Sequence, residues 1–152
     1  MYNASTDTLP GSVAWLGYGG LLPFVGTALA IFVDPHHADL WSDALMAYGA
    51  VILSFVGALH WGFAMSLPSL DAGCRRACFI WSTVPALMAW PATLLEPLDA
   101  GLLLVTGFLV HYWQDRRLAA RARLPGWYLP LRLRLTAVAC GSLLAGVFLV
   151  SV

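Results

Sequence analysis

The sequence contains no lysine and few charged residues of any kind. Charged residues make up 11% of its 152 positions, hydrophobic residues make up 60%, and the mean hydropathy is +0.76. Soluble domains carry about 25% charged residues, so the polar surface is too small for a soluble enzyme, a nucleic-acid-binding protein or a disordered segment. The composition indicates an integral membrane protein whose main surroundings are the lipid bilayer.

Cysteine is also scarce, and the familiar catalytic motifs are missing. Of the three cysteines, Cys74 and Cys78 are four residues apart but have no second pair and no nearby histidine in sequence. This pattern does not indicate a zinc site. The sequence has no nucleophile elbow, no HExxH motif, no phosphate-binding loop and no acidic pair within an apolar stretch. We therefore expect a protein that is not an enzyme and has no bound metal.

Five apolar stretches are long enough, or nearly so, to cross a bilayer, which takes roughly 20 helical residues. They are apolar on all sides and lack the alternation of barrel strands. The sequence therefore predicts an all-α integral membrane bundle of five transmembrane helices in one domain, residues 1–152. The predicted spans are 12–33, 43–67, 76–95, 98–113 and 133–152. The fourth, with 16 residues, is short, and Gly20 followed by Pro23 predicts a kink in the first.

The arginines support an odd number of crossings. With five spans, all eight fall on the side of the N-terminus, at positions 75, 76, 116, 117, 121, 123, 132 and 134. The charged residues on the opposite side are all acidic. The positive-inside rule therefore predicts a cytoplasmic N-terminus and a periplasmic C-terminus in a bacterial inner membrane. Between the fourth and fifth spans, the Arg-rich loop 114–132 with its aromatic pair predicts a short interfacial segment.

Small residues recur at four-residue spacing in two of the spans. Such residues let helix backbones approach closely in lipid, where no hydrophobic force holds helices together. The second span carries Ala50, Ser54 and Ala58, and the fifth carries Ala137, Gly141 and Ala145. We expect these two helices to pack in the interior of the bundle or at an oligomer contact.

The candidate site is a group of polar and aromatic residues near the Arg-rich side. Ionisable residues inside a bilayer are costly and are the default functional candidates, and His60 and His111 both lie in the cytoplasmic half of their spans. The candidate ligand or partner residues are His60, Trp61, His111, Asp115, Arg116, Arg117, Trp127, Tyr128 and Arg132.

Three interpretations of this group stay open. It could be structural, with Asp115 paired to Arg116, Arg117 or Arg132. It could bind a lipid headgroup or a quinone, since aromatic residues lie beside arginines. It could bind haem through two histidines, although residue counting places His60 and His111 at different depths.

Several segments resemble an uncharacterised bacterial inner-membrane family related to mitochondrial transmembrane protein 69. They are GLLPF (20–24), AYGAVILSFVGALHWG (47–62), WSTVPALMAW (81–90), DRR (115–117) and WYLPLRLRLT (127–136). The resemblance implies a small multi-pass protein with no established activity. It also places His60, Trp61, Asp115, Trp127, Tyr128 and Arg132 on the motif positions of the family.

Two functions are consistent with these observations. We expect an accessory or assembly subunit that packs against a larger respiratory or photosynthetic membrane complex, or against copies of itself. The alternative is a small-molecule-binding protein, for quinone, lipid or haem, or a small carrier that uses the histidine, arginine and tryptophan cluster. The first function predicts co-migration with a large complex, and the second predicts a co-purified ligand.

Overall fold

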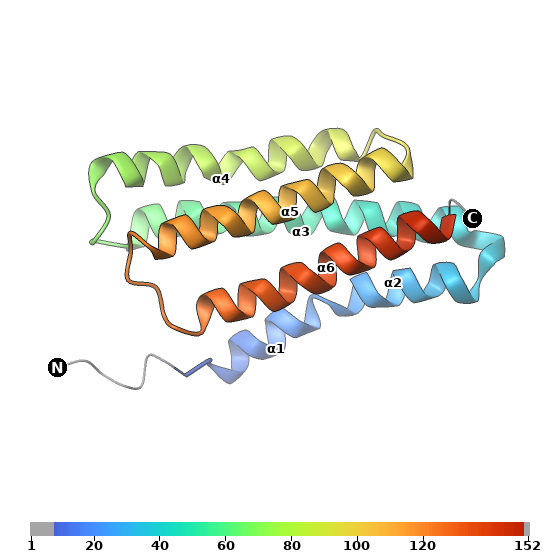
Figure 1. Cartoon of the computed structure of the whole chain (residues 1–152), viewed down its shortest axis with the longest axis horizontal. Helices are drawn as coiled ribbons and strands as arrows, with labels where there is room; N and C mark the ends of the chain where they lie inside the picture. Colours follow the sequence, from blue (N-terminus) through green and yellow to red (C-terminus); the bar gives the residue numbers. More distant parts are fainter. Residues whose placement is uncertain (1–7, 151–152) are drawn as a thin grey trace.

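The computed structural model describes residues 8–150, and over these residues the protein is all-α, as predicted (Figure 1). The elements are α1 (Gly11–Gly19), α2 (Leu22–Val33), the short 3-10 helix η2 (Pro35–His37), α3 (Ala38–Ser66), α4 (Ala72–Ala92), α5 (Pro97–Ala119) and α6 (Tyr128–Val150). The long helices lie side by side along one axis, and α3 packs against α2, α4, α5 and α6. The site is built around the inner faces of α3, α5 and α6.

The first apolar stretch is broken, as its glycines predicted. Helix α1 ends at Gly19 and α2 begins at Leu22 with Pro23 in its first turn. The carbonyl of Gly20 accepts a hydrogen bond from the Tyr48 hydroxyl at 2.8 Å, so a side chain of α3 satisfies a backbone group freed by the break. No residue of α1 is buried, so α1 lies at the edge of the bundle while α2 packs within it.

Three of the described segments are long and apolar enough to cross a membrane. They are Gly11–Val33, Pro35–Ser66 and Tyr128–Leu149. Helices α4 and α5 have sufficient length, at 21 and 23 residues, but they are less apolar. The chain therefore has three clear candidate spans and two further helices of similar length packed beside them.

The helix that contains the predicted fourth span is longer than that span. Helix α5 continues six residues beyond residue 113, to Ala119, because Gln114–Ala119 contains neither glycine nor proline and consists mostly of good helix formers. At 23 residues it is about 35 Å long, so it is not short. Arg116 and Arg117 belong to α5, and residues 120–127 connect α5 to α6.

The other predicted boundaries differ less. Helix α3 begins at Ala38, five residues before the predicted start, and α6 begins at Tyr128 instead of residue 133. Helix α4 begins at Ala72, where the Asp71 carboxylate accepts a hydrogen bond from the Cys74 amide at 2.8 Å, a standard N-terminal cap.

The connections between the helices alternate between the two ends of the bundle. The start of α1, the α3–α4 connection and the α5–α6 connection lie at one end, and the η2 turn and the α4–α5 connection lie at the other (Figure 1). All eight arginines belong to the elements at the first end, in the first turn of α4, the last turn of α5, the segment that follows it, and the first two turns of α6. The bundle thus carries its arginines at one end, on α4, α5, α6 and the α5–α6 connection.

The closest helix contacts are made at glycines. A Cβ atom at Gly57 would lie 2.8 Å from the Pro85 ring, and one at Gly107 would lie 2.5 Å from Leu53. Real Cβ atoms essentially never come so close to another atom. The Pro85 ring is rigid, so Gly57 sets the spacing of α3 from α4, whereas a Cβ at Gly107 would displace the end of the Leu53 side chain.

The small-residue prediction holds only in part. Of the first stripe, Ala50 is buried, Ser54 is half-buried and Ala58 is exposed. The second stripe faces outward, since Ala137, Gly141 and Ala145 are all exposed. Helix α6 instead turns Gly146 toward α3, where a Cβ would lie 2.4 Å from Leu45. An interior position is therefore wrong for the α6 stripe, and the oligomer-contact alternative stays a prediction.

Candidate functional site

Asp115 lies at the centre of the polar cluster. This α5 residue is fully buried, at 0% exposure. One carboxylate oxygen, Oδ2, accepts a hydrogen bond from Nε of Arg132 at 2.8 Å, and Oδ1 accepts one from the Tyr128 hydroxyl at 3.0 Å. Both partners come from the start of α6. The guanidinium compensates the carboxylate charge, which a buried carboxylate requires.

Two histidines complete the cluster from α3 and α5. Nε2 of His60 and Nε2 of His111 lie 3.8 and 3.7 Å from Oδ1 of Asp115, and the two rings form a T-shaped pair with centroids 4.9 Å apart. The expectation that they sit at different depths was wrong. It followed from ending the fourth span at residue 113, whereas α5 runs to Ala119 and places His111 deeper.

Trp81 of α4 orients His111. Its indole Nε1 donates a hydrogen bond to Nδ1 of His111 at 3.0 Å. A neutral imidazole has one donor and one acceptor nitrogen, so His111 carries its proton on Nε2, the nitrogen that faces Asp115. Trp81 was not among the predicted site residues, although it lies in the third span at a depth similar to the histidines. Its polar indole N–H, which needs a partner when buried, was the signal in the sequence.

The three innermost residues meet one criterion for a metal site. His60, His111 and Asp115 each offer a ligand atom, and these atoms lie within 4.8 Å of one another. Their chemistry is less suitable, because Arg132 already neutralises Asp115 and because the hydrogen bond from Trp81 directs a proton to the nitrogen of His111 that faces the carboxylate. This donor set favours hydrogen bonding over cation binding.

The structure brings together five of the nine predicted site residues: His60, His111, Asp115, Tyr128 and Arg132. The other four lie outside the cluster. Trp61 is half exposed and contacts Phe79, Arg116 is exposed, Arg117 lies over the Trp113 ring, and Trp127 contacts Tyr128 from the edge. Of the three arginines considered as partners for Asp115, Arg132 is the one that pairs with it.

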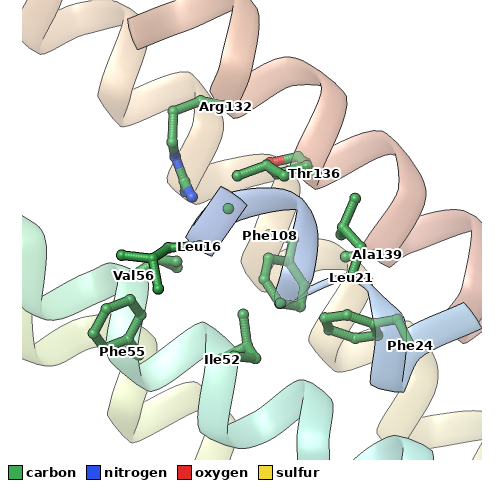
Figure 2. A pocket seen from close by; sticks show the side chains of 13 residues that line it. Leu16, Leu21, Phe24, Ile52, Phe55, Val56, Phe108, Arg132, Thr136 and Ala139 are labelled. Carbon is green, nitrogen blue, oxygen red and sulfur yellow. The ribbon is translucent and has the colours of Figure 1, made fainter. Parts of the chain in front are cut away.

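Cavities lie on two sides of the cluster. An apolar cavity of about 130 Å³ lies between α1, α2, α3, α5 and α6 and is bordered by Arg132 and Thr136 (Figure 2). A second cavity of about 110 Å³ is lined by His60, Trp81, Gln114 and Arg117, among others. Thr136 was not predicted as a site residue. Its hydroxyl, one turn beyond Arg132 on the same helix, was the available signal.

Several buried polar atoms of the site have no hydrogen-bond partner among the described residues. They include both ring nitrogens of His60, Nη2 of Arg132 and Oγ1 of Thr136. Buried polar groups are nearly always paired, so these atoms mark positions at which a ligand or water would gain hydrogen bonds.

Comparison with known proteins places the chain in a family. Residues 9–148 match the family described as "Protein of unknown function (DUF3429)". Transmembrane protein 69 of Xenopus tropicalis is 38% identical over 136 residues, which cover 88% of this chain and 53% of that protein. Transmembrane protein 69 of Mus musculus is 28% identical over 136 residues, which cover 86% of this chain and 53% of that protein.

The chain spans about half the length of these curated relatives. No solved structure matches it. The matched region includes every residue of the buried cluster and all of the five helical stretches except the last two residues of α6. Together with its three long apolar segments, these matches show that the chain is a multi-pass membrane protein that belongs to the DUF3429 family, a distant homologue of transmembrane protein 69.

Proposed function

We propose that the chain crosses a bacterial inner membrane five times, with α4 and α5 as the two additional spans. Both helices run the length of the bundle, α4 beside the apolar α3 and α5 beside both α3 and α6. Their arginines lie at the same end as those of α6. This one-sided charge supports a cytoplasmic N-terminus and a periplasmic C-terminus by the positive-inside rule.

Within that membrane the chain is a non-enzymatic accessory or assembly subunit that packs against a larger respiratory or photosynthetic complex. The observation that carries this proposal is the outward stripe Ala137, Gly141 and Ala145 on α6, where a Cβ added at Gly141 would meet nothing within 4 Å. Beside it, residues of α2 and α6 line a shallow apolar groove of about 390 Å³. Small exposed residues beside a groove suit the close approach of another transmembrane helix.

Gly141→Leu tests this function, because its bulk would prevent a helix from entering the groove. The full chain, extracted in mild detergent, should migrate on native gels with a large complex, and Gly141→Leu should migrate separately as a smaller species. Gly62→Leu is the control, since Gly62 on α3 is exposed and also has no atom within 4 Å of an added Cβ. Mass spectrometry of the band separates a heterologous complex from a homo-oligomer. Migration of all three proteins as the same small species would contradict the proposal.

A second candidate function is the binding of a small molecule, and one observation favours it. The cavity of about 130 Å³ is apolar, yet its lining includes Arg132 and Thr136, whose Nη2 and Oγ1 atoms have no hydrogen-bond partner among the described residues. Quinone and lipid both combine an apolar body with hydrogen-bond acceptors. Haem is the weakest of the three predicted ligands, since a porphyrin would have to lie between His60 and His111, whose rings contact each other.

A further inference from the structure

The cavity bordered by Arg132, hereafter the Arg132 cavity, has mostly apolar walls. Its lining includes Leu16, Phe24, Ile52, Phe55, Val56 and Phe108, contributed by α1, α2, α3 and α5 (Figure 2). Its volume of about 130 Å³ is close to that of an engineered cavity of about 150 Å³ that binds benzene in another protein. The space therefore suits one ring or a short length of acyl chain.

The polar side chains that line the cavity come from α6. The side chains of Arg132 and Thr136 are 6% and 4% exposed, and Nη2 of Arg132 and Oγ1 of Thr136 have no hydrogen-bond partner among the described residues. Figure 2 shows both side chains on the α6 wall, opposite Ile52 and Phe55 of α3. Both groups can donate, so an oxygen acceptor inside the cavity would satisfy them.

The charge of Arg132 is already compensated. Its Nε lies 2.8 Å from Oδ2 of Asp115, so the pair as a whole is neutral. A carboxylate or phosphate beside it would add a second buried negative charge without a matching cation, which is unfavourable. A neutral carbonyl oxygen accepts from the same donors without that cost.

The mouth of the cavity opens on the side of the bundle. Leu16 and Phe55, which both line it, are 79% and 63% exposed. Since α1 and α3 belong to the candidate spans, this surface faces acyl chains in a membrane. A ligand would therefore enter laterally from the lipid.

We propose that the Arg132 cavity binds a neutral, carbonyl-bearing apolar molecule whose carbonyl oxygen accepts hydrogen bonds from Nη2 of Arg132 and Oγ1 of Thr136. This inference rests on the second candidate function and specifies its ligand. A quinone ring and the ester end of an acyl chain share this chemistry.

Four probes test the proposal on the full chain in dodecyl maltoside, a detergent without carbonyl groups. They are a short-chain benzoquinone, methyl decanoate, undecane and decanoate, and each affinity is referred to partition into empty micelles. The benzoquinone, the ester or both should bind at least about tenfold more tightly than undecane, the gain that one to two hydrogen bonds provide. Which of the two binds identifies the source of the carbonyl.

Two variants locate the binding. Thr136→Val keeps the shape but loses the hydroxyl, and it should weaken binding of the carbonyl probe by about three- to tenfold without changing undecane binding. Ala139→Leu fills the cavity from α6 and should weaken binding of every probe. Thr83→Val on α4 and Ala47→Leu on α3 are the matched controls, because both residues are exposed and neither lines the cavity. Unfolding midpoints show that each variant is folded.

Four results would overturn the proposal in distinguishable ways. Equal affinity for undecane and the carbonyl probes would refute recognition of the carbonyl while leaving small-molecule binding in place. Tighter binding of decanoate than of the neutral carbonyl probes would refute the argument that a second negative charge is unfavourable beside Arg132. Failure of every probe to bind, or binding unaffected by Ala139→Leu, would remove the second candidate function as well. None of these results depends on native-gel migration, so the subunit proposal is tested separately.

Discussion

Asp115 and Arg132 form a buried ion pair between α5 and α6, with 2.8 Å between Oδ2 and Nε. The two residues are separated by 17 positions that include the loop between the helices. The pair, together with the hydrogen bond from the Tyr128 hydroxyl to the same carboxylate, therefore holds the end of α5 against the start of α6. Because both groups are removed from solvent, the loss of either leaves an uncompensated charge.

Removing one partner should destabilise the protein strongly. We expect Asp115→Asn and Arg132→Met each to lower the free energy of unfolding by about 3–5 kcal/mol, measured by denaturant titration in detergent. The double variant should lose clearly less free energy of unfolding than the two single variants lose together, because it leaves no unpaired charge. Arg116→Met, at an exposed position of the same helix, should change stability by less than about 0.5 kcal/mol. Additive losses would show that the two side chains do not interact.

The tautomer of His111 depends on Trp81. In the native chain, ¹⁵N chemical shifts should identify Nδ1 as the unprotonated nitrogen of His111, because it accepts from the indole of Trp81. Trp81→Phe removes the donor, so we expect a mixture of tautomers and a loss of about 1 kcal/mol of stability. Trp90→Phe is the control, since Trp90 lies on the same helix and is 69% exposed. A protonated Nδ1 in the native chain would contradict the assigned hydrogen bond.

Two glycine substitutions on α3 should affect stability differently, because Gly57 contacts a neighbouring helix and Gly62 does not. A methyl group at Gly57 would lie 2.8 Å from Pro85 of α4, whereas one at Gly62 meets nothing within 4 Å. Gly57→Ala should force the helices apart and destabilise by about 1–3 kcal/mol. Gly62→Ala should be neutral or slightly stabilising, because alanine favours helix. Unfolding of both variants in the same detergent checks this, and equal effects would show that α3 and α4 are not in close contact at Gly57.

Reporter fusions test the five-span topology. A periplasm-active reporter should work at the C-terminus and at the α4–α5 connection, and a cytoplasm-active reporter should work at the N-terminus and at the α5–α6 connection. The physical reason is retention of the arginine-rich end in the cytoplasm. Activity of the same reporter at both chain ends would refute an odd number of crossings.

Acid should disrupt the turn between α2 and α3. Hydrogen bonds from His37 and then Trp41 hold the pKa of the Asp34 carboxyl below its usual value of 3.8. Their stabilising effect is therefore present above pH 3.8 and is lost as the pH falls through the lower pKa of the folded state. The difference in fluorescence between the native chain and the Asp34→Asn variant reports the environment of Trp41. We expect this difference to persist near neutral pH and to vanish as the pH falls through the pKa of Asp34 in the folded state. A difference that is independent of pH would contradict this coupling.

The helices and the cluster were predictable to different degrees. The five helical stretches and the break near Gly20 follow from runs of apolar residues and from the local effect of glycine and proline. The end of α5 did not follow, because hydropathy falls after residue 113 although the helix continues to Ala119. That error also misplaced His111 relative to His60.

The partners inside the cluster could not be derived from the order of residues. Three arginines lay close enough in sequence to pair with Asp115, and the rotation of α6 selects Arg132 while Arg116 and Arg117 point outward from α5. The same rotation turns Thr136 inward and leaves Ala137 and Gly141 exposed. Sequence spacing shows that Thr136 lies on a different face of the helix from Ala137 and Gly141. It does not show which face packs against the bundle.

Composition and hydropathy thus establish a multi-pass helical membrane protein with its arginines grouped at one end, because transfer of apolar residues into lipid is a local property of each segment. The ion pair of Asp115 with Arg132, the contact of His60 with His111 and the Arg132 cavity were decided only by the packed bundle. They depend on how far each helix is rotated and shifted against its neighbours, and that is set by close contacts such as Gly57 against Pro85.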